Sequence, residues 1–251
     1  MMPKISVLMP VYNIVSDPAG KFLLSNAVES IIVQDFENWE MIIANDGSVD
    51  DTLDAIQDIA RLDKRIRVLD LEHQGIGGVI NSAAAVARAE YLARMDQDDM
   101  SVVYRFSVQN DILDRNADIG ITGSGMWVIN SDGHIIMEIV RPSAHEDIIL
   151  FAIQFGSPFV HGSVMMRRSI FEKVGRYRVG CATEDFDLWF RMLSATKGYN
   201  FPEPMYVYRQ HPSSASFTLK KEMAAATAEV HALFVDRFGH LAPFRSEKFV
   251  S

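Results

Sequence analysis

The chain of 251 residues, 48% of them hydrophobic and 23% charged, has the size and composition of a globular protein that buries a core of its own. Its net charge of −9 argues against a protein that binds nucleic-acid phosphates, because such binding requires a basic face. The one cysteine, Cys181, excludes a disulfide within the chain and a cysteine-based zinc site, and it fits a reducing compartment.

Two features bear on where the protein works. Residues 1–4 lead directly into an apolar run and lack the charged and apolar regions of a signal peptide. No uninterrupted apolar stretch approaches the roughly 18 residues that a membrane span requires. We therefore expect a cytoplasmic protein, and a peripheral contact with the inner face of the membrane stays open.

The first hundred residues alternate predicted strands with predicted helices. Short apolar runs that end in turn-forming residues indicate the strands, and apolar residues at helical spacing indicate the helices. This repeat predicts a parallel sheet with helices on both faces. The predicted strands are 4–9, 39–44, 66–71 and 91–95, and the predicted helices are 22–33, 51–62 and 77–89.

Polar residues follow each of these four strands. In a parallel sheet, ligands bind beyond the carboxyl ends of the strands, so residues that follow different strands meet at one edge. Four polar clusters at one edge are a stronger signal of a binding site than any one of them. The clusters are Pro10–Asn13, Asn45–Ser48, Gln74–Gly75 and Asp96–Asp99.

The cluster after the fourth strand contains three carboxylates. Asp96, Asp98 and Asp99 would be costly to bury unless a cation neutralises them. Alternate side chains of an extended segment point to the same side, so Asp96 and Asp98 would face together. Such oxygen ligands suit Mg²⁺ or Mn²⁺, and the ion would in turn hold a diphosphate. A second interpretation stays open, an acidic loop that caps a helix starting near Ser101.

The second half of the chain has a different pattern. The residues 131–133, Ser-Asp-Gly, predict a hairpin turn, and Thr183 is the expected N-cap of the helix that follows it. We find no linker and no internal repeat. The predicted strands are 125–130, 134–139, 160–166 and 204–208, and the predicted helices are 102–116, 145–155, 169–174, one from Thr183 and 217–238.

Five short motifs, taken together and in this order, resemble the family 2 glycosyltransferases with the GT-A fold. The resemblance runs from residue 10 to residue 211, which is most of the chain. The motifs are Pro10–Asn13, Asn45–Ser48, Asp96–Asp99, Glu184–Trp189 and Tyr208–His211.

The resemblance implies an α/β fold with a Rossmann-like half, a mostly parallel central sheet and helices on both of its faces. A lobe on the acceptor side would add a β-hairpin and a C-terminal helix. We expect one domain over residues 1–251, with a nucleotide-sugar-binding half over about 1–100, an acceptor and catalytic half over about 101–215, and a C-terminal helix and tail over 216–251.

Enzymes of this family move a sugar from a nucleotide diphosphate-sugar to an acceptor hydroxyl. The resemblance implies a UDP-sugar donor, inversion at the anomeric carbon, and Mn²⁺ or Mg²⁺ as cofactor. The acceptor would be a carbohydrate or a lipid-linked sugar in polysaccharide or glycolipid biosynthesis. A homodimer stays open, and nucleic acid is not expected as a partner.

The resemblance also assigns roles to residues of the donor half. Asp98 and His211 would bind the metal ion. Asp99 is not assigned to the ligand site and is expected only to cap the next helix. The residues expected to bind the nucleotide-sugar are Pro10, Val11, Tyr12, Asn13, Asp46, Gln74, Gly75, Asn81, Asp96 and Gln97.

In the second half, Asp185 is the expected catalytic base, because an acceptor hydroxyl is a poor nucleophile until a carboxylate takes its proton. His161, Glu184 and Trp189 are candidates for the acceptor side. Ordinary structural interpretations stay open: Glu184 and Asp185 could merely complement a helix dipole, Trp189 could be a core aromatic, and His211 an exposed loop histidine. Asp187 lies two residues on from Asp185 and is expected to be structural.

Three departures from the family pattern are present. Ala89 stands where a glycine is common, and Val79 and Ile80 stand near the place of a frequent arginine, which leaves open how the diphosphate is held. The first loop, residues 13–20, is longer than usual.

The same residues bear on three other possible functions. A non-catalytic nucleotide-sugar-binding protein is the alternative that the fold leaves open. A nucleotidyltransferase would carry a glycine-rich basic loop after the first strand, and an NAD-binding protein would carry G-x-G-x-x-G there. The chain has Pro10–Asn13 in that place, which argues against both.

Overall fold

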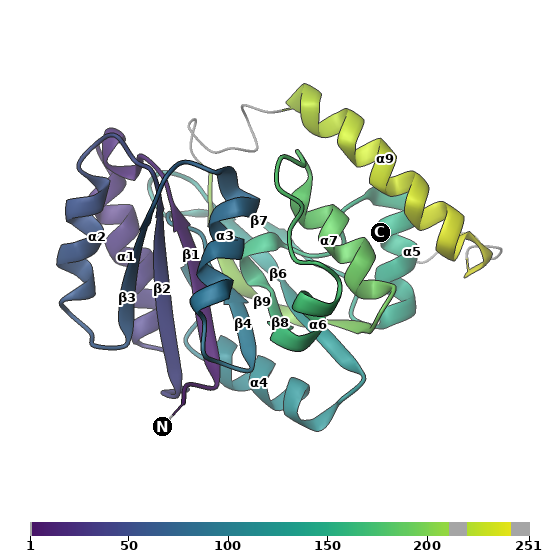
Figure 1. Cartoon of the computed structure of the whole chain (residues 1–251). Helices are drawn as coiled ribbons and strands as arrows, with labels where there is room; N and C mark the ends of the chain where they lie inside the picture. Colours follow the sequence, from purple (N-terminus) through teal and green to yellow (C-terminus); the bar gives the residue numbers. More distant parts are fainter. Residues whose placement is uncertain (1, 211–219, 242–251) are drawn as a thin grey trace.

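The computed structural model describes residues 2–210 and 220–241. Within them nine strands form one mixed sheet. The strands are β1 (Ile5–Val11), β2 (Trp39–Asp46), β3 (Ile66–Leu71), β4 (Tyr91–Arg94), β5 (Met100–Ser101), β6 (Ile119–Ile129), β7 (Ile135–Ile139), β8 (Met165–Arg167) and β9 (Lys197–Arg209). Their order across the sheet is β3-β2-β1-β4-β8-β6-β9-β5, and β7 pairs with β6 (Figure 1).

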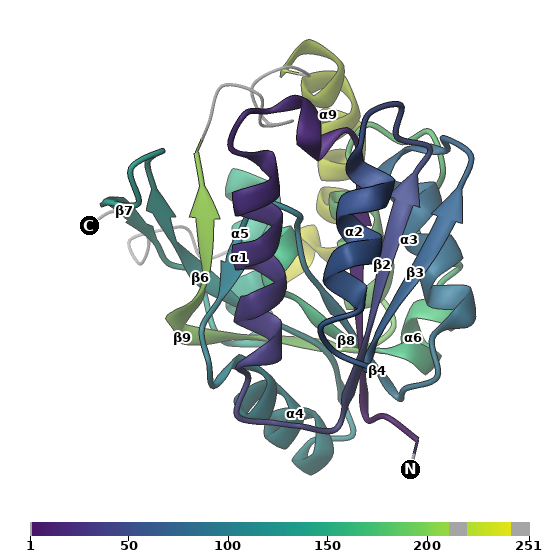
Figure 2. The ribbon, with the colours of Figure 1, turned by 90° about the vertical axis from the view of Figure 1, so that its left-hand side faces the viewer.

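Helices lie on both faces of this sheet. Figure 2 shows α1 and α2 over one face of the first strands, and Figure 1 shows α3 on the other. The helices are α1 (Gly20–Ile32), α2 (Thr52–Ala60), α3 (Gly75–Val86), α4 (Arg105–Arg115), α5 (His145–Phe155), α6 (Arg168–Lys173), α7 (Glu184–Leu193) and α9 (Lys220–Phe238), with short 3₁₀ turns η1 (Ile14–Ser16), η2 (His161–Ser163) and η3 (Gly239–Leu241).

The four predicted strands of the first half are confirmed. β1 pairs in parallel with β2 and with β4, and β2 pairs in parallel with β3. Alternate residues of β1 pack on opposite faces: Val7 lies in one core cluster with Leu24 and Ile56 of α1 and α2, and Leu8 lies in another with Ile80 of α3. Because both faces of β1 and β2 are buried, these two strands are largely apolar rather than alternating.

The second half extends the sheet with strands of mixed direction. β8 is antiparallel to β4 and β6, and β6 is parallel to β9. The predicted hairpin is confirmed, because β6 and β7 pair antiparallel across residues 131–133. The helix expected over 145–155 is confirmed as α5.

The predicted strand 160–166 is wrong in its first half. Residues 161–163 form the turn η2, and β8 starts only at Met165. Ser163 closes the turn, because its backbone N–H and its hydroxyl both donate to the carbonyl of Val160 at 2.9 Å. Local hydrogen bonding by a short polar side chain overrides the apolar pattern here.

Two further boundaries move because β9 is longer than expected, spanning Lys197–Arg209 instead of 204–208. The short strand β5 pairs with it, and Val102 donates its N–H to the carbonyl of Met205 at 3.2 Å. Residues 100–102 are therefore taken up by the sheet, and the helix predicted over 102–116 begins at Arg105.

The C-terminal helix α9 packs on α7 and α5 (Figure 1). Its buried Phe234 stacks on Phe186 of α7 with ring centroids 5.2 Å apart and meets Phe190 edge-on, also at 5.2 Å. Of the helix predicted over 217–238, the residues 217–219 lie outside the described residues. No helix among the described residues is long and apolar enough to cross a membrane.

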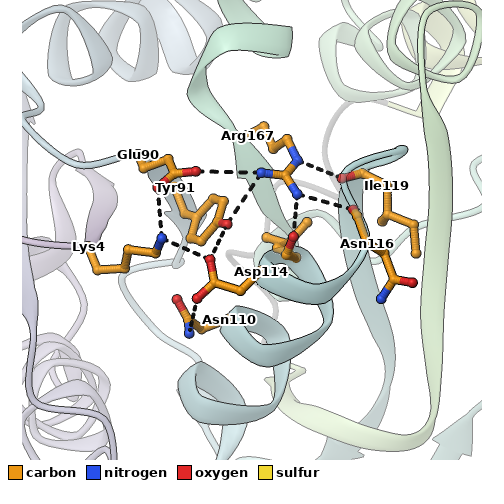
Figure 3. Close-up of polar contacts among 9 residues, drawn as sticks. Lys4, Glu90, Tyr91, Asn110, Asp114, Asn116, Ile119 and Arg167 are labelled. Atoms are coloured by element: carbon orange, nitrogen blue, oxygen red, sulfur yellow. Dashed lines mark hydrogen bonds and ion pairs between the residues drawn. The ribbon is translucent and has the colours of Figure 1, made fainter.

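A network of polar side chains joins α4 to the start of β4 and to β8 (Figure 3). The ammonium group of Lys4 lies 2.7 Å from a carboxylate oxygen of Glu90 and 2.8 Å from one of Asp114. Tyr91 donates its hydroxyl to Asp114 at 2.7 Å, and Arg167 donates to the Tyr91 hydroxyl at 3.3 Å. Two cations and two carboxylates thus balance one another at the end of the sheet opposite the polar clusters predicted to bind ligands.

Candidate active site

A buried arginine lies directly under the acidic turn that follows β4. The side chain of Arg94 is 0% exposed, and its Nη2 lies 2.6 Å from Oδ1 of Asp96. Burial is the largest single influence and raises the pKa of Asp96, but Arg94, His161 and Tyr206 together outweigh burial and hold that pKa below its ordinary value. A bound cation was expected to neutralise the carboxylates, but Arg94 itself supplies part of the positive charge.

A second buried arginine supports the first. Arg105 of α4 donates through Nη2 to the carbonyls of Arg94, at 2.9 Å, and of Val164, at 3.1 Å. Its Nε donates to Gln109 at 3.0 Å. Burial lowers the pKa of Arg105 to about 10. These contacts fix the backbone from which the acidic turn begins.

Asp99 faces the protein interior rather than a helix. It is 2% exposed and accepts the backbone N–H of Arg209 at 2.8 Å. Burial, followed by the charges of Asp98 and Asp96, raises its pKa well above the ordinary value. The expectation that Asp99 caps the next helix is wrong, because α4 begins six residues later and Tyr104 precedes it.

The half-buried Asp98 lies between Asp96 and Asp99 on this turn. Among residues 2–210 and 220–241, no three histidine, cysteine, aspartate or glutamate side chains lie close enough together to hold a metal ion. His211, the other predicted metal ligand, lies outside the described residues. A complete set of protein ligands for a metal is therefore not present in the described part of the chain.

The turn after β2 is tied to the start of α3 through Asp46. Its carboxylate is 5% exposed and accepts the backbone N–H groups of Gln74, at 2.8 Å, and Gly75, at 3.0 Å. Nδ1 of His73 lies 3.1 Å from the same carboxylate. Asp46 is therefore occupied in holding residues 73–75 against the end of β2.

An aromatic pair stands at the edge of this turn. The rings of Tyr12 and His73 lie 4.7 Å apart at their centroids and at 33° to one another, and both side chains are largely exposed. The backbone N–H of Tyr12 donates to Gln97 at 2.9 Å. Exposed, offset rings of this kind are suited to stacking on a planar base. Tyr12 was predicted from the sequence and His73 was not, although its position after β3 indicates the same edge of the sheet.

The remaining donor-half residues lie around the same edge. Asn13, with a left-handed φ of 47°, donates its N–H to Ser48 at 2.9 Å and accepts that of Val49 at 2.9 Å. Pro10 and Val11 are the last residues of β1. Six of the predicted residues thus gather on adjoining loops: Tyr12, Asn13, Asp46, Gln74, Gly75 and Gln97.

Asn81 connects the two halves of the chain. Its side-chain amide donates to the carbonyl of Tyr177 at 2.8 Å and accepts the N–H of the same residue at 3.1 Å. In this structure the amide is therefore bound to the segment that precedes α7, and a contact with a nucleotide-sugar remains a prediction.

Glu184 and Asp185 form the first turn of α7. Burial raises the pKa of Glu184 to about 7, and the charge of Asp185 adds to the effect. Burial also raises the pKa of Asp185, against the backbone N–H of Phe186, which donates to it at 2.7 Å. Thr183 stands at the N-cap position of the helix, as predicted, but its side chain does not cap it; the Thr183 hydroxyl is buried and has no hydrogen-bond partner among the described residues.

The neighbouring Asp187 is structural, as expected. It is 1% exposed and forms ion pairs at 2.6 Å with both Arg178 and Arg191. The pair with Arg178 holds α7 to the segment that precedes it, and Arg191 also donates to the carbonyl of Val174 at 2.6 Å. Two carboxylates two residues apart on one helix therefore have different environments.

His161 lies between the acidic turn and α7. Its Nε2 is 2.8 Å from the hydroxyl of Tyr177, and its ring meets that of Trp189 edge-on at 5.9 Å. Burial lowers its pKa to about 3, and Arg94 acts in the same direction, so the imidazole is neutral. Trp189 is 0% exposed, in keeping with a core aromatic, and its indole N–H has no hydrogen-bond partner among the described residues.

Comparison with known proteins agrees with this geometry. The sequence profile of the family described as Glycosyl transferase family 2 matches residues 6–175. The chain belongs to glycosyltransferase family 2. It is 34% identical over 214 residues to EpsE of Bacillus subtilis, a protein named as a glycosyltransferase, and the match covers 83% of this chain and 73% of EpsE. It is 29% identical over 192 residues to the O-antigen biosynthesis glycosyltransferase WbnJ of Escherichia coli, with 75% and 74% covered.

Solved structures show the same fold. TarS of S. aureus, in complex with UDP-GlcNAc, superimposes with a TM-score of 0.71 at 17% identity, over 93% of this chain and 67% of that one. The mannosyltransferase PcManGT of Pyrobaculum calidifontis, in complex with GDP-Man and Mn²⁺, gives 0.66 at 14% identity, over 94% and 70%. The α/β fold expected from the motifs, of the GT-A type, is thereby confirmed.

Proposed function

We propose that this glycosyltransferase moves a sugar from a UDP-sugar to an acceptor hydroxyl, with inversion at the anomeric carbon. The observation that carries the proposal is that the buried Arg94 influences carboxyl groups from both halves of the chain. Burial is the larger influence on both Asp96 and Asp185, but the charge of Arg94 lowers the pKa of each. Carboxylates from the donor half and from α7 are thus influenced by the same buried cation, which supports a site that takes two substrates.

The donor side of the proposal rests on the edge formed by β1, β2 and β3. The exposed rings of Tyr12 and His73 would stack on the base, and residues 73–75, held by Asp46, would shape the pocket around it. UDP is the first candidate because TarS binds UDP-GlcNAc, and GDP is the second because PcManGT binds GDP-Man.

A divalent cation, Mn²⁺ or Mg²⁺, fits the oxygen donor of Asp98. Asp98 would hold it together with the diphosphate oxygens of the donor and, as predicted, His211. Such an ion neutralises the charge of the leaving diphosphate. Val79 and Ile80 of α3, near the place where the family often has an arginine, are buried in the core and carry no charge, which supports the need for an ion.

The proposed base is Asp185. It would accept the proton of the acceptor hydroxyl as the oxygen attacks the anomeric carbon and the nucleoside diphosphate leaves from the opposite face. Its raised pKa makes it a stronger base than an exposed aspartate. Glu184, whose pKa is raised to about 7, lies beside it and would be partly protonated near neutrality.

The acceptor is proposed as a carbohydrate or lipid-linked sugar in polysaccharide biosynthesis. Support comes from WbnJ, a relative that acts in O-antigen biosynthesis. His161 and Glu184 are the candidates to contact it.

The test is a thermal-shift panel with UDP, dTDP, GDP and CMP, each with and without Mn²⁺. A ligand that binds only the folded protein at a hundred times its dissociation constant adds roughly 3 kcal/mol of stability, which is readily measured. We expect UDP to raise the melting temperature, and to do so more strongly with Mn²⁺. Equal shifts with and without Mn²⁺ would contradict metal dependence. The absence of a shift with every nucleotide would contradict the proposed donor class.

A further inference from the structure

We propose that Tyr206 of β9 is a positioning residue that fixes the carboxylate of Asp96 for donor binding; this inference rests on the proposed function. Asp96 lies beyond the end of β4, in a turn without regular backbone pairing. A side chain in such a turn needs contacts from elsewhere in the protein to hold one orientation. Those contacts come from two residues, one adjacent in sequence and one far away.

The hydroxyl of Tyr206 binds Asp96 twice. It accepts the backbone N–H of Asp96 at 3.2 Å, and it donates to Oδ2 of the same residue, also at 3.2 Å. The other carboxylate oxygen, Oδ1, is held by Arg94 at 2.6 Å. Both oxygens and the backbone of Asp96 are thereby fixed, and the carboxylate cannot rotate without breaking one of these bonds.

Space for this contact is provided by Gly162. A Cβ atom at that position would lie 2.1 Å from the Tyr206 hydroxyl oxygen and 2.7 Å from Oδ2 of Asp96. Such distances are far below van der Waals contact. The missing side chain in η2 therefore allows the tyrosine hydroxyl and the carboxylate to approach one another.

Tyr206 is itself rigidly placed. It is 1% exposed, and β9 holds it between β6 and β5, where it lies opposite Ser101. The same strand binds the acidic turn a second time, through the N–H of Arg209 and the carboxylate of Asp99. The geometry of the turn after β4 is thus imposed by a strand more than one hundred residues later in the chain.

The substitution Tyr206→Phe separates positioning from packing, because it keeps the buried ring and removes only the hydroxyl. Tyr199→Phe is the matched control: the same change on the same strand, at a tyrosine whose hydroxyl is not in contact with the acidic turn. UDP with Mn²⁺ serves as the probe, and its affinity is measured by isothermal titration calorimetry for the wild type and for both variants.

We expect Tyr206→Phe to weaken UDP binding about tenfold, the effect of losing the hydrogen bonds that orient one ligand-binding group. Tyr199→Phe should bind UDP as the wild type does. Equal affinity of Tyr206→Phe and the wild type would overturn the proposal.

A second measurement needs no ligand. Amide hydrogen exchange, followed by NMR, should be accelerated at Asp96 in Tyr206→Phe and unchanged at Leu92 and Ala93 of β4. Unchanged exchange at Asp96 would overturn the proposed contact. Exchange could be accelerated as expected while the wild type binds no nucleotide. That result would contradict the proposed donor and the role of Tyr206 in donor binding, but it would confirm the contact between Tyr206 and Asp96.

Discussion

At the N-terminal end of β4, Lys4 and Arg167 face Glu90 and Asp114 in a network where cations and carboxylates are equal in number. At the other end of the same four-residue strand, the buried Arg94 acts on Asp96 and on Glu184 and Asp185 of α7, and Asp98 and Asp99 follow Asp96 on the acidic turn. The two clusters use the same residue types, but only in the second do carboxyl groups outnumber the cations.

The difference is visible in the carboxyl groups themselves. At the balanced end, burial raises the pKa of Asp114, but its hydrogen bonds to Lys4 and Tyr91 outweigh burial and lower it. At the acidic end, burial and neighbouring carboxylates raise the pKa of Asp99 and Glu184. Groups that destabilise one another in this way are typical of functional sites, because a bound cation or a substrate proton relieves the repulsion. We therefore propose that the balanced end stabilises the fold and that the acidic end binds a ligand.

The largest effect is expected at the proposed base. Asp185→Asn should lower sugar transfer by about 10²- to 10⁴-fold, because the amide cannot accept the acceptor proton, and it should leave UDP binding unchanged. Release of UDP from UDP-sugars in the presence of saccharide acceptors measures the transfer rate. Asp54→Asn, an exposed aspartate in the first turn of α2, is the control. Transfer by Asp185→Asn at the wild-type rate would show that another group is the base.

Removal of the buried cation should be the next largest effect. Arg94→Met leaves Asp96 partly buried without its ion pair and should lower the free energy of unfolding by about 3–5 kcal/mol. Arg167→Met at the balanced end should cost less, about 1–2 kcal/mol, because Lys4 remains beside the same carboxylates. Urea unfolding measures both. Equal costs at the two ends would contradict the distinction drawn between them.

The smallest expected effect concerns pH. Burial raises the pKa of Glu184 from 4.5 to about 7, so the folded protein holds this proton more tightly than the unfolded chain does. Ionisation of Glu184 therefore lowers stability as the pH rises from about 4.5 to about 7. Glu184→Gln removes this penalty, and its melting temperature relative to the wild type should be higher at pH 8 than at pH 5, by about 2–4 °C.

The matched control for this measurement is Glu146→Gln, an exposed glutamate in the first turn of α5. Its melting temperature relative to the wild type should be the same at both pH values. A pH-independent difference for Glu184→Gln would mean that its carboxyl group is not destabilised by its surroundings.

Much of the fold was predictable because its signals are local. The apolar runs of β1 to β4 indicate buried strands without reference to the rest of the chain, and the helix 145–155 is confirmed at both ends. The first part of β9 was missed because Pro202 and Pro204 interrupt its pattern. The turn η2 was missed because its cause is Ser163, whose hydrogen bond to Val160 replaces the expected strand.

Site residues that follow the ends of strands could be predicted from the sequence. Contacts between residues far apart in the sequence could not. Tyr12, Asp46 and Gln97 lie on adjoining loops, as the parallel sheet requires. The partnership of Asp96 with Tyr206 joins residues 110 positions apart, and no periodic pattern in the sequence indicates such a contact. The ion pair of Arg94 with Asp96 could have been predicted, because an arginine in a buried strand two residues before a carboxylate is itself a signal of such a pair.

The most direct test of the account compares the two ends of β4 in one titration experiment. UDP is titrated in the presence of Mn²⁺ into the wild type, into Asp98→Asn at the acidic end and into Asp114→Asn at the balanced end. The account predicts that Asp114→Asn binds UDP as tightly as the wild type and that Asp98→Asn loses the Mn²⁺-dependent binding. Retained Mn²⁺-dependent binding in Asp98→Asn would contradict the assignment of the acidic turn as the donor and metal site.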